Sequence, residues 1–295
     1  MGGSPESCSV RGAQVTTMRE ITVAHSPDAD DAFMFWALAH EKFPTPGLKY
    51  RHVLSDIQTL SKAAFSKTYD LTAISFHAYA HLHRDYALLL SGASIGEKYG
   101  PRVVAMSAHT RESLRGKRIA HPGDLTTAYL AMRLWLPDCI PVAMDFNEVG
   151  GAVKRGEVDA GVIIHEGQLT WQAEGFHLIR DLGEWWFDET GLPLPLGGNA
   201  IRRDLGQPTL GQVAAHLKTS IEMGLTHRDD ALTYAMGFGR GLDREKADAF
   251  VAMYVNAQTI EMSADTRRAV QLLLDRGADV GVIPERVQVE FIACG

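Results

Sequence analysis

The chain of 295 residues is predicted to be an α/β protein with two domains and a ligand cleft between them. Its length exceeds what one ordinary hydrophobic core fills. Short apolar runs alternate with amphipathic helical segments from Arg19 onward, which is typical of a parallel sheet covered by helices. The alternation restarts after Ser107 and stops at a proline-rich segment near Leu196. These two breaks predict a domain that is inserted into a first one.

In the first domain, runs of apolar and β-branched residues predict strands, and segments with helical periodicity follow them. Asp30-Asp31 opens the first predicted helix and Asp56 caps the second, because acidic side chains are favoured at a helix start. The predicted strands cover residues 21–25, 49–54, 71–75 and 101–107, and the predicted helices cover 30–40, 57–65 and 76–84.

The same alternation recurs in the inserted domain, and the last third of the chain is mainly helical. The segment Gly191–Gly198 contains two prolines, so it cannot be a helix and is predicted to be a returning crossover. The predicted strands are 117–120, 140–144, 159–164 and 176–182, and the predicted helices are 126–135, 148–155, 209–226, 228–236, 243–255 and 264–276. The predicted domains are an outer one, from residues 19–107 and 197–295, and an inserted one, from 108–196, after a disordered extension at 1–18.

Composition restricts the class of partner. The formal net charge of −7 argues against nucleic acid or an anionic membrane surface as the main partner, but it is compatible with a small anionic ligand in one pocket. The first residues lack the apolar core of a signal peptide, and no run approaches the roughly 18 apolar residues of a membrane span. The three cysteines form neither a CxxC pair nor a zinc spacing. We therefore expect a reduced, cytoplasmic protein.

The segment Asp159–Glu166 ends a predicted buried strand in an imidazole and a carboxylate. In open α/β sheets, ligands bind beyond the carboxyl ends of the strands. Histidine can take or give a proton near neutral pH without a large pKa shift. His165 is therefore a candidate general base. The alternative is that it caps the strand and bonds a backbone carbonyl.

Two predicted helix starts carry small hydroxyl side chains. Thr126 and Thr127 follow a Gly123-Asp124-Leu125 turn, and Ser75 stands between a strand and a helix of the other domain. The first N–H groups of a helix have no partner within it and attract anions. Together with His165 across the cleft, these helix starts predict a site for a small carboxylate. The alternative is that they are ordinary N-caps.

Two further clusters are interpreted as structural. Asp28–Asp31 offers oxygen ligands to a hard cation, but it lacks the spacing of a calcium loop, so helix capping is favoured. His77 and His81 have the i, i+4 spacing of a metal chelate. Because no third ligand accompanies them, a solvated helix face is the preferred interpretation.

Several segments match the motifs of a known family. Ser26-Pro27, followed by Asp31–Phe35, is similar to a Ser-Pro-Cys-Pro-Asn-Asp-Thr-Phe motif after the first strand. The other matching segments are Thr126-Thr127, Ile163–Glu166, Leu192–Gly197 and Tyr254–Asn256. In these segments, from about Ile21 to past Asn256, the chain resembles 1,4-dihydroxy-6-naphthoate synthase of the futalosine route to menaquinone.

The resemblance implies a periplasmic-binding-protein-like fold of type II, used as a cytosolic enzyme. Members of that family are carbon–carbon lyases that cleave cyclic dehypoxanthinyl futalosine to the dihydroxynaphthoate and a sugar-derived fragment, with no metal or organic cofactor. The family's proton acceptor falls on His165. The positions that would hold the small anionic aromatic substrate fall on Ala73, Ile74, Ser75, Thr126, Thr127 and Ile164.

Four positions depart from the similar motif: Asp28, Ala29, Asp30 and Ala32 stand where it has Cys, Pro, Asn and Thr. Extra carboxylates should repel an anionic substrate, so one alternative is a divergent paralogue that takes another small substrate. Another alternative is a solute-binding protein for a small carboxylate, which the fold alone would suggest. An enzyme is favoured over a binding protein because binding alone needs no titratable group at the ligand position.

Overall fold

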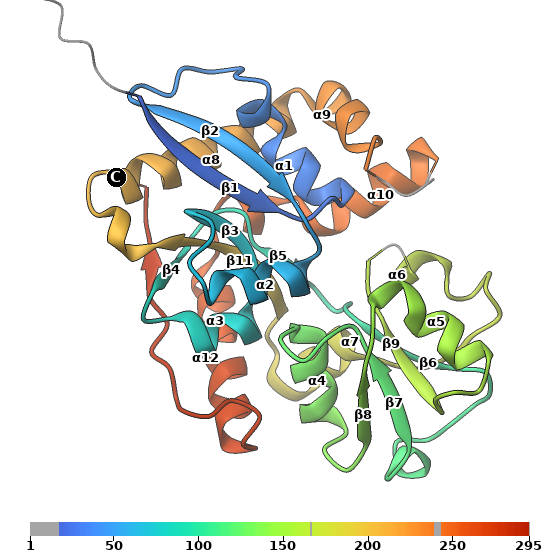
Figure 1. Ribbon diagram of the computed structural model, residues 1–295. Coiled ribbons are helices and arrows are strands. Elements are labelled where there is room, and N and C mark those ends of the chain that lie inside the picture. The colour runs from blue at the N-terminus through green and yellow to red at the C-terminus, as the bar shows by residue number, and fades with distance from the viewer. Residues whose placement is uncertain (1–17, 166, 239–242, 295) are drawn as a thin grey trace, which may run out of the picture.

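The computed structural model describes residues 18–165, 167–238 and 243–294, and its strands form two separate sheets (Figure 1). All but the last residue of the extension predicted at 1–18 lies outside the described residues. Within the described part of the chain, no helix is long and apolar enough to cross a membrane.

Seven strands of the described chain form the first sheet, which is mixed. β1 pairs in parallel with both β2 and β3, whereas β11 runs antiparallel to β3, β4 and β5. In sheet order the strands are β12 (Phe291–Ile292), β4 (Tyr86–Leu89), β11 (Leu194–Arg202), β3 (Leu71–Ser75), β1 (Arg19–His25) and β2 (Leu48–Leu54), and β5 (Ser94–Gly96) pairs with β11.

Helices cover the first sheet with two apolar cores. One core joins β1 and β2 to α1, α8, α9 and α10, and the other lies under α3 and α12. The helices of this unit are α1 (Ala29–Ala39), α2 (Ile57–Ala64), α3 (Phe76–Leu82), α8 (Thr209–Thr226), α9 (Arg228–Ala235), α10 (Arg244–Tyr254), α11 (Ala257–Ile260) and α12 (Ala264–Asp279), with a short 3-10 helix at Arg203–Leu205.

The second sheet has five strands in the order β10-β6-β9-β7-β8. β7 is parallel to β8 and β9, and β6 is antiparallel to β9 and β10. Its elements are β6 (Arg102–Ala105), β7 (Arg118–His121), β8 (Ile140–Ala143), β9 (Ala160–Ile163), β10 (His177–Asp181), α4 (Thr127–Trp135), α5 (Phe146–Lys154), α6 (Gly167–Thr170) and α7 (Leu182–Thr190), with a 3-10 helix at Glu112–Leu114.

Two predictions about the sheets were wrong. β6 was predicted to belong to the outer domain, yet it lies between β9 and β10 in the second sheet. The chain therefore passes from the first sheet to the second before Arg102 and not after Ser107. The proline-rich crossover contains β11, whose pairing with β5 shifts register between Pro195 and Gly197. A proline without an N–H is tolerated at such an irregularity, so this segment forms an interior strand.

The two units pack directly against each other where α4 meets α3 and α12. Residues of all three helices share one apolar core. Gly277 of α12 allows this approach, because a Cβ there would lie 2.7 Å from Ile283 Cδ1 and 3.0 Å from Leu130 Cδ1. The carboxyl ends of β1, β3 and β9 and the starts of α1, α3 and α4 are thereby brought around one pocket.

Candidate active site

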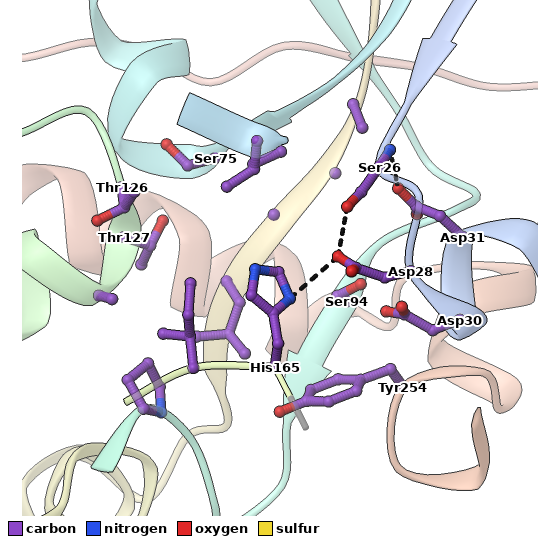
Figure 2. A pocket seen from close by; sticks show the side chains of 18 of the residues that line it. Ser26, Asp28, Asp30, Asp31, Ser75, Ser94, Thr126, Thr127, His165 and Tyr254 are labelled. Carbon is purple, nitrogen blue, oxygen red and sulfur yellow. Dashed lines mark hydrogen bonds and ion pairs between the residues drawn. The ribbon is translucent and has the colours of Figure 1, made fainter. Parts of the chain in front are cut away.

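One pocket contains every residue that the sequence predicted for the site. It encloses about 800 Å³, including the part that is open to solvent. Its walls come from both units, and Figure 2 shows labelled side chains from each of them facing it. The predicted residues that line it are Ala73, Ile74, Ser75, Thr126, Thr127, Ile164 and His165.

At one end, which we call the hydroxyl end (Ser75, Thr126 and Thr127), side chains cap helix starts. Ser75 Oγ accepts a hydrogen bond from Ala78 N at 2.9 Å and donates one to the carbonyl of Leu125. The second bond joins the two units, because Ser75 ends β3 and Leu125 precedes α4. The hydroxyl of Ser75 is therefore used within the protein.

The two threonines of the hydroxyl end differ. Thr126 Oγ1 caps α4 by accepting from Tyr129 N at 3.1 Å, and it donates to the carbonyl of Gly123 at 2.8 Å. Thr127 Oγ1 accepts from His77 N at 3.3 Å, which leaves its own proton for a ligand. Both side chains are buried at the pocket wall. Of the three predicted hydroxyls, Thr127 is therefore the one suited to donate to a bound anion.

Between the two ends the pocket is lined by apolar residues. Ala73 and Ile74 of β3 lie beside β11, where Ile74 pairs with Gly198. A Cβ at Gly198 would lie 3.2 Å from the ring of Phe76, so a side chain at this position would crowd that ring. Ile164 lies on the opposite unit, directly after β9. This arrangement suits a flat ring system.

His165 lies at the other end, which we call the acidic end (Ser26, Asp28, Asp30, Asp31 and His165). Its Nδ1 atom lies 3.0 Å from Asp28 Oδ2. Its ring packs edge-on against Phe146, with 4.8 Å between ring centroids. The backbone of His165 has a φ of +53°, a left-handed conformation that residues other than glycine rarely adopt. Glu166, the next residue, lies outside the described residues.

The aspartates of the acidic end differ from the predicted helix caps. Asp28 occupies the N-cap position of α1, but its side chain makes no capping hydrogen bond and accepts one from Ser26 Oγ (Figure 2). Asp31 Oδ2 accepts from Ser26 N at 2.7 Å. The capping interpretation was therefore wrong for Asp28, because a tertiary partner takes its carboxylate. Within the described residues, no group of three or more His, Cys, Asp or Glu side chains could hold a metal ion.

Burial sets the charge of this end. Burial, followed by the negative charge of Asp28, raises the pKa of Asp30, and His165 lowers it, with a net value of about 7. Burial, followed by the charge of Asp30, raises the pKa of Asp31 well above its ordinary value. The cluster therefore retains protons near neutral pH that isolated aspartates would lose.

Outside the acidic end, three polar lining residues were not predicted, namely Ser94, Gln168 and Tyr254, and the side chain of His77 was misplaced. Tyr254 Oη donates to Gln168 Oε1 at 3.0 Å, so α10 of the outer unit is joined to α6 beside His165. Tyr254 had a signal, since it begins one of the matching segments, whereas Gln168 had none. His77 is buried, with 2% exposure, so the solvated face expected for it was wrong.

Solved structures with the same architecture define the class of fold. The alkanesulfonate-binding protein of Xanthomonas axonopodis pv. citri has a TM-score of 0.72 at 17% identity, over 94% of this chain and 99% of that one. A Candida albicans protein with the generic periplasmic-binding-protein fold has a TM-score of 0.63 at 11% identity, over 92% and 98%. The chain therefore has a two-unit periplasmic-binding-protein-like fold, with its pocket between the sheets.

Closer relatives give the family. A protein from Archaeoglobus fulgidus with a crystal structure is 46% identical, with a TM-score of 0.86, over 92% of this chain and 100% of that one. The 1,4-dihydroxy-6-naphthoate synthases of Streptomyces coelicolor and Thermus thermophilus are 35% and 36% identical, over 90% and 87% of this chain and 95% and 93% of theirs. The family model described as menaquinone biosynthesis matches residues 21–279. The chain belongs to this menaquinone biosynthesis family.

Proposed function

We propose that this protein is a carbon–carbon lyase that converts cyclic dehypoxanthinyl futalosine to 1,4-dihydroxy-6-naphthoate, with His165 as the general base. One observation carries the proposal. In a chain of the menaquinone biosynthesis family, a strand-end imidazole lies in the same pocket as a helix start suited to a carboxylate. Two 1,4-dihydroxy-6-naphthoate synthases more than a third identical to this chain support the choice of reaction.

The substrate carboxylate is placed at the hydroxyl end. There the first N–H groups of α4 and the Thr127 hydroxyl can donate to it, and the positive end of the helix dipole favours its charge. At the acidic end, the Asp28 carboxylate disfavours an anion, and so does any negative charge on Asp30 and Asp31. The pocket would therefore bind the substrate in one orientation, with its sugar-derived part beside His165.

The chemistry needs a base and a fixed geometry. His165 takes the proton of a substrate hydroxyl, the adjacent carbon–carbon bond breaks, and its electron pair passes to the ring system while the alkoxide becomes a carbonyl. The two fragments together hold all the atoms of the substrate, so this retro-aldol step is balanced without an oxidant or reductant. Cofactors are thus unnecessary for the proposed reaction.

Incubation of the purified protein with cyclic dehypoxanthinyl futalosine tests the proposal. We expect 1,4-dihydroxy-6-naphthoate to form, detected by absorbance and mass. Calorimetric titration of the same compound separates the alternatives. Binding without turnover would favour a solute-binding protein, and neither binding nor turnover would favour a paralogue with another substrate.

A further inference from the structure

The imidazole of His165 is held from two sides. Asp28 of the outer unit contacts Nδ1 at 3.0 Å, and Phe146 of the inserted unit packs against the ring. The side chain of His165 is only 17% exposed and that of Asp28 only 3%. Figure 2 shows the other ring nitrogen turned toward the side of the pocket where Ser75 and Thr127 lie. The ring therefore presents a defined nitrogen to a ligand.

A purely local role does not account for the carboxylate of Asp28. At an N-cap an aspartate normally accepts from the N–H groups of the first helical turn, but Asp28 makes no such bond. It accepts from Ser26 Oγ and faces His165 instead. A carboxylate buried to this degree is costly unless it is paired and hydrogen-bonded, and these two neighbours supply that pairing.

We infer that Asp28 is a positioning residue for His165, an inference that rests on the proposed function: it accepts the Nδ1 proton and so makes Nε2 the basic nitrogen. Asp28 keeps its negative charge throughout and stabilises the imidazolium that forms when Nε2 takes the substrate proton. Among the described residues, Asp30 and Asp31 interact with both members of this pair, and His25 interacts with Asp28. Burial is the largest cause that raises the pKa of each of these two aspartates, and the charge of Asp28 also raises both, so they hold protons more tightly than isolated aspartates do.

The contact between Asp28 and His165 also depends on how the two units pack against each other. Asp28 follows β1 of the outer unit, and His165 follows β9 of the inserted unit. The contact therefore joins the two units across the pocket, which links the tautomer of the base to the way the units pack.

The tautomer of His165 can be measured without substrate. Nitrogen NMR of protein labelled at histidine, with the His165→Ala variant for assignment, should show a protonated Nδ1 and a bare Nε2. Asp28→Asn and Asp28→Ala should populate the other tautomer, whereas Asp30→Asn, which alters the same cluster but keeps the Asp28 carboxylate beside Nδ1, should not. A protonated Nε2 in the unaltered protein, or an unchanged tautomer in both Asp28 variants, would overturn the inference.

Turnover supplies the second readout. The corresponding substitution behind the histidine of a serine-protease triad costs about 10,000-fold in kcat, so we expect Asp28→Asn to lower kcat by at least about 100-fold with little change in KM. Melting temperatures of both Asp28 variants show whether they fold. Near-normal kcat in a folded Asp28 variant would refute the inference. If the unaltered protein shows no turnover, the proposed function fails, while the NMR result still decides the role of Asp28.

Discussion

At the hydroxyl end of the pocket, Ser75 and Thr126 accept from N–H groups of the helices they cap and donate to carbonyls nearby. At the acidic end, Asp28, Asp30 and Asp31 lie together at the start of α1, and the side chain of Asp28 does not cap that helix. The first set of side chains stabilises the fold. The second set places carboxyl groups where burial opposes their charge, as the raised pKa values of Asp30 and Asp31 show.

This difference between the two ends indicates which of them serves mainly the fold and which serves mainly function. A hydroxyl that satisfies a helix start serves the fold whether or not a ligand binds. Buried carboxyl groups beside a histidine in a left-handed conformation reduce stability, and such features persist chiefly at functional sites. We therefore expect substitutions at the acidic end to affect catalysis most and those at the hydroxyl end to affect stability or affinity.

The largest effect is expected for His165→Ala. Loss of a general base lowers kcat by about 100- to 10,000-fold, because only water remains to take the proton. Truncation opens no packed core, but it removes one partner of the buried Asp28 carboxylate, so we expect a folded variant with a lowered melting temperature. Turnover and melting temperature are measured together, with His177→Ala as the control, because His177 is an exposed histidine on β10. A variant that melts early yet keeps its activity per folded molecule would identify His165 as a structural cap.

Next in size is a pH-dependent gain in stability for Asp30→Asn. The raised pKa of Asp30, about 7, means that the folded chain binds more protons than the unfolded chain between about pH 4 and 7. This term therefore lowers stability as pH rises through that window. The amide does not titrate, so the free energy of unfolding of the variant should increase relative to that of the unaltered protein from pH 4 to 7.

Denaturant unfolding of both proteins at pH 4, 5.5 and 7.5 measures that difference. His25 contributes the opposite slope, because burial lowers its pKa to about 3, but it is present in both proteins and cancels. Equal stability differences at all three pH values would show that Asp30 is not held protonated by burial.

These two ends also differ in how far the sequence predicted them. The hydroxyl end follows from local rules, because a strand end, a cap and a helix start lie within a few residues of one another, and Ser75, Thr126 and Thr127 all line the pocket. The pairing of Asp28 with His165 joins segments 137 residues apart through the contact of two units. Local spacing holds no information on such a pair, and the helix-start position of Asp28 indicated a cap instead.

The sheets show the same limit. Strands and helices with clear periodicity, such as β3 and α8, have the predicted bounds within a residue. β11 was missed because its prolines indicate a loop, and its place between β3 and β4 depends on partners more than 100 residues away. β6 was predicted as a strand but placed in the wrong sheet, since an antiparallel return to β9 leaves no mark on its own sequence.

A moderate loss of stability is expected for Thr126→Ala. The variant loses the cap of α4, which typically costs about 1 kcal/mol of unfolding free energy. Because its hydroxyl already donates to Gly123, the affinity for an anion should change little. Denaturant unfolding and ligand titration are run on the same preparation. A large loss of affinity with unchanged stability would assign this hydroxyl to the ligand and not to the helix.

The smallest effect is expected for Thr127→Val, which keeps the shape of the side chain and removes the hydroxyl. If that hydroxyl donates to the bound carboxylate, its loss should weaken binding of 1,4-dihydroxy-6-naphthoate by about 1 kcal/mol, or about fivefold in Kd. Thr127→Ser retains the donor and should bind as the unaltered protein does. Because Thr127 also accepts from His77 N, melting temperatures must be compared for both variants. Equal affinity of the valine and serine variants would mean that the backbone N–H groups of α4 hold the carboxylate alone. In that case the hydroxyl end would act on the ligand only through the helix it shapes.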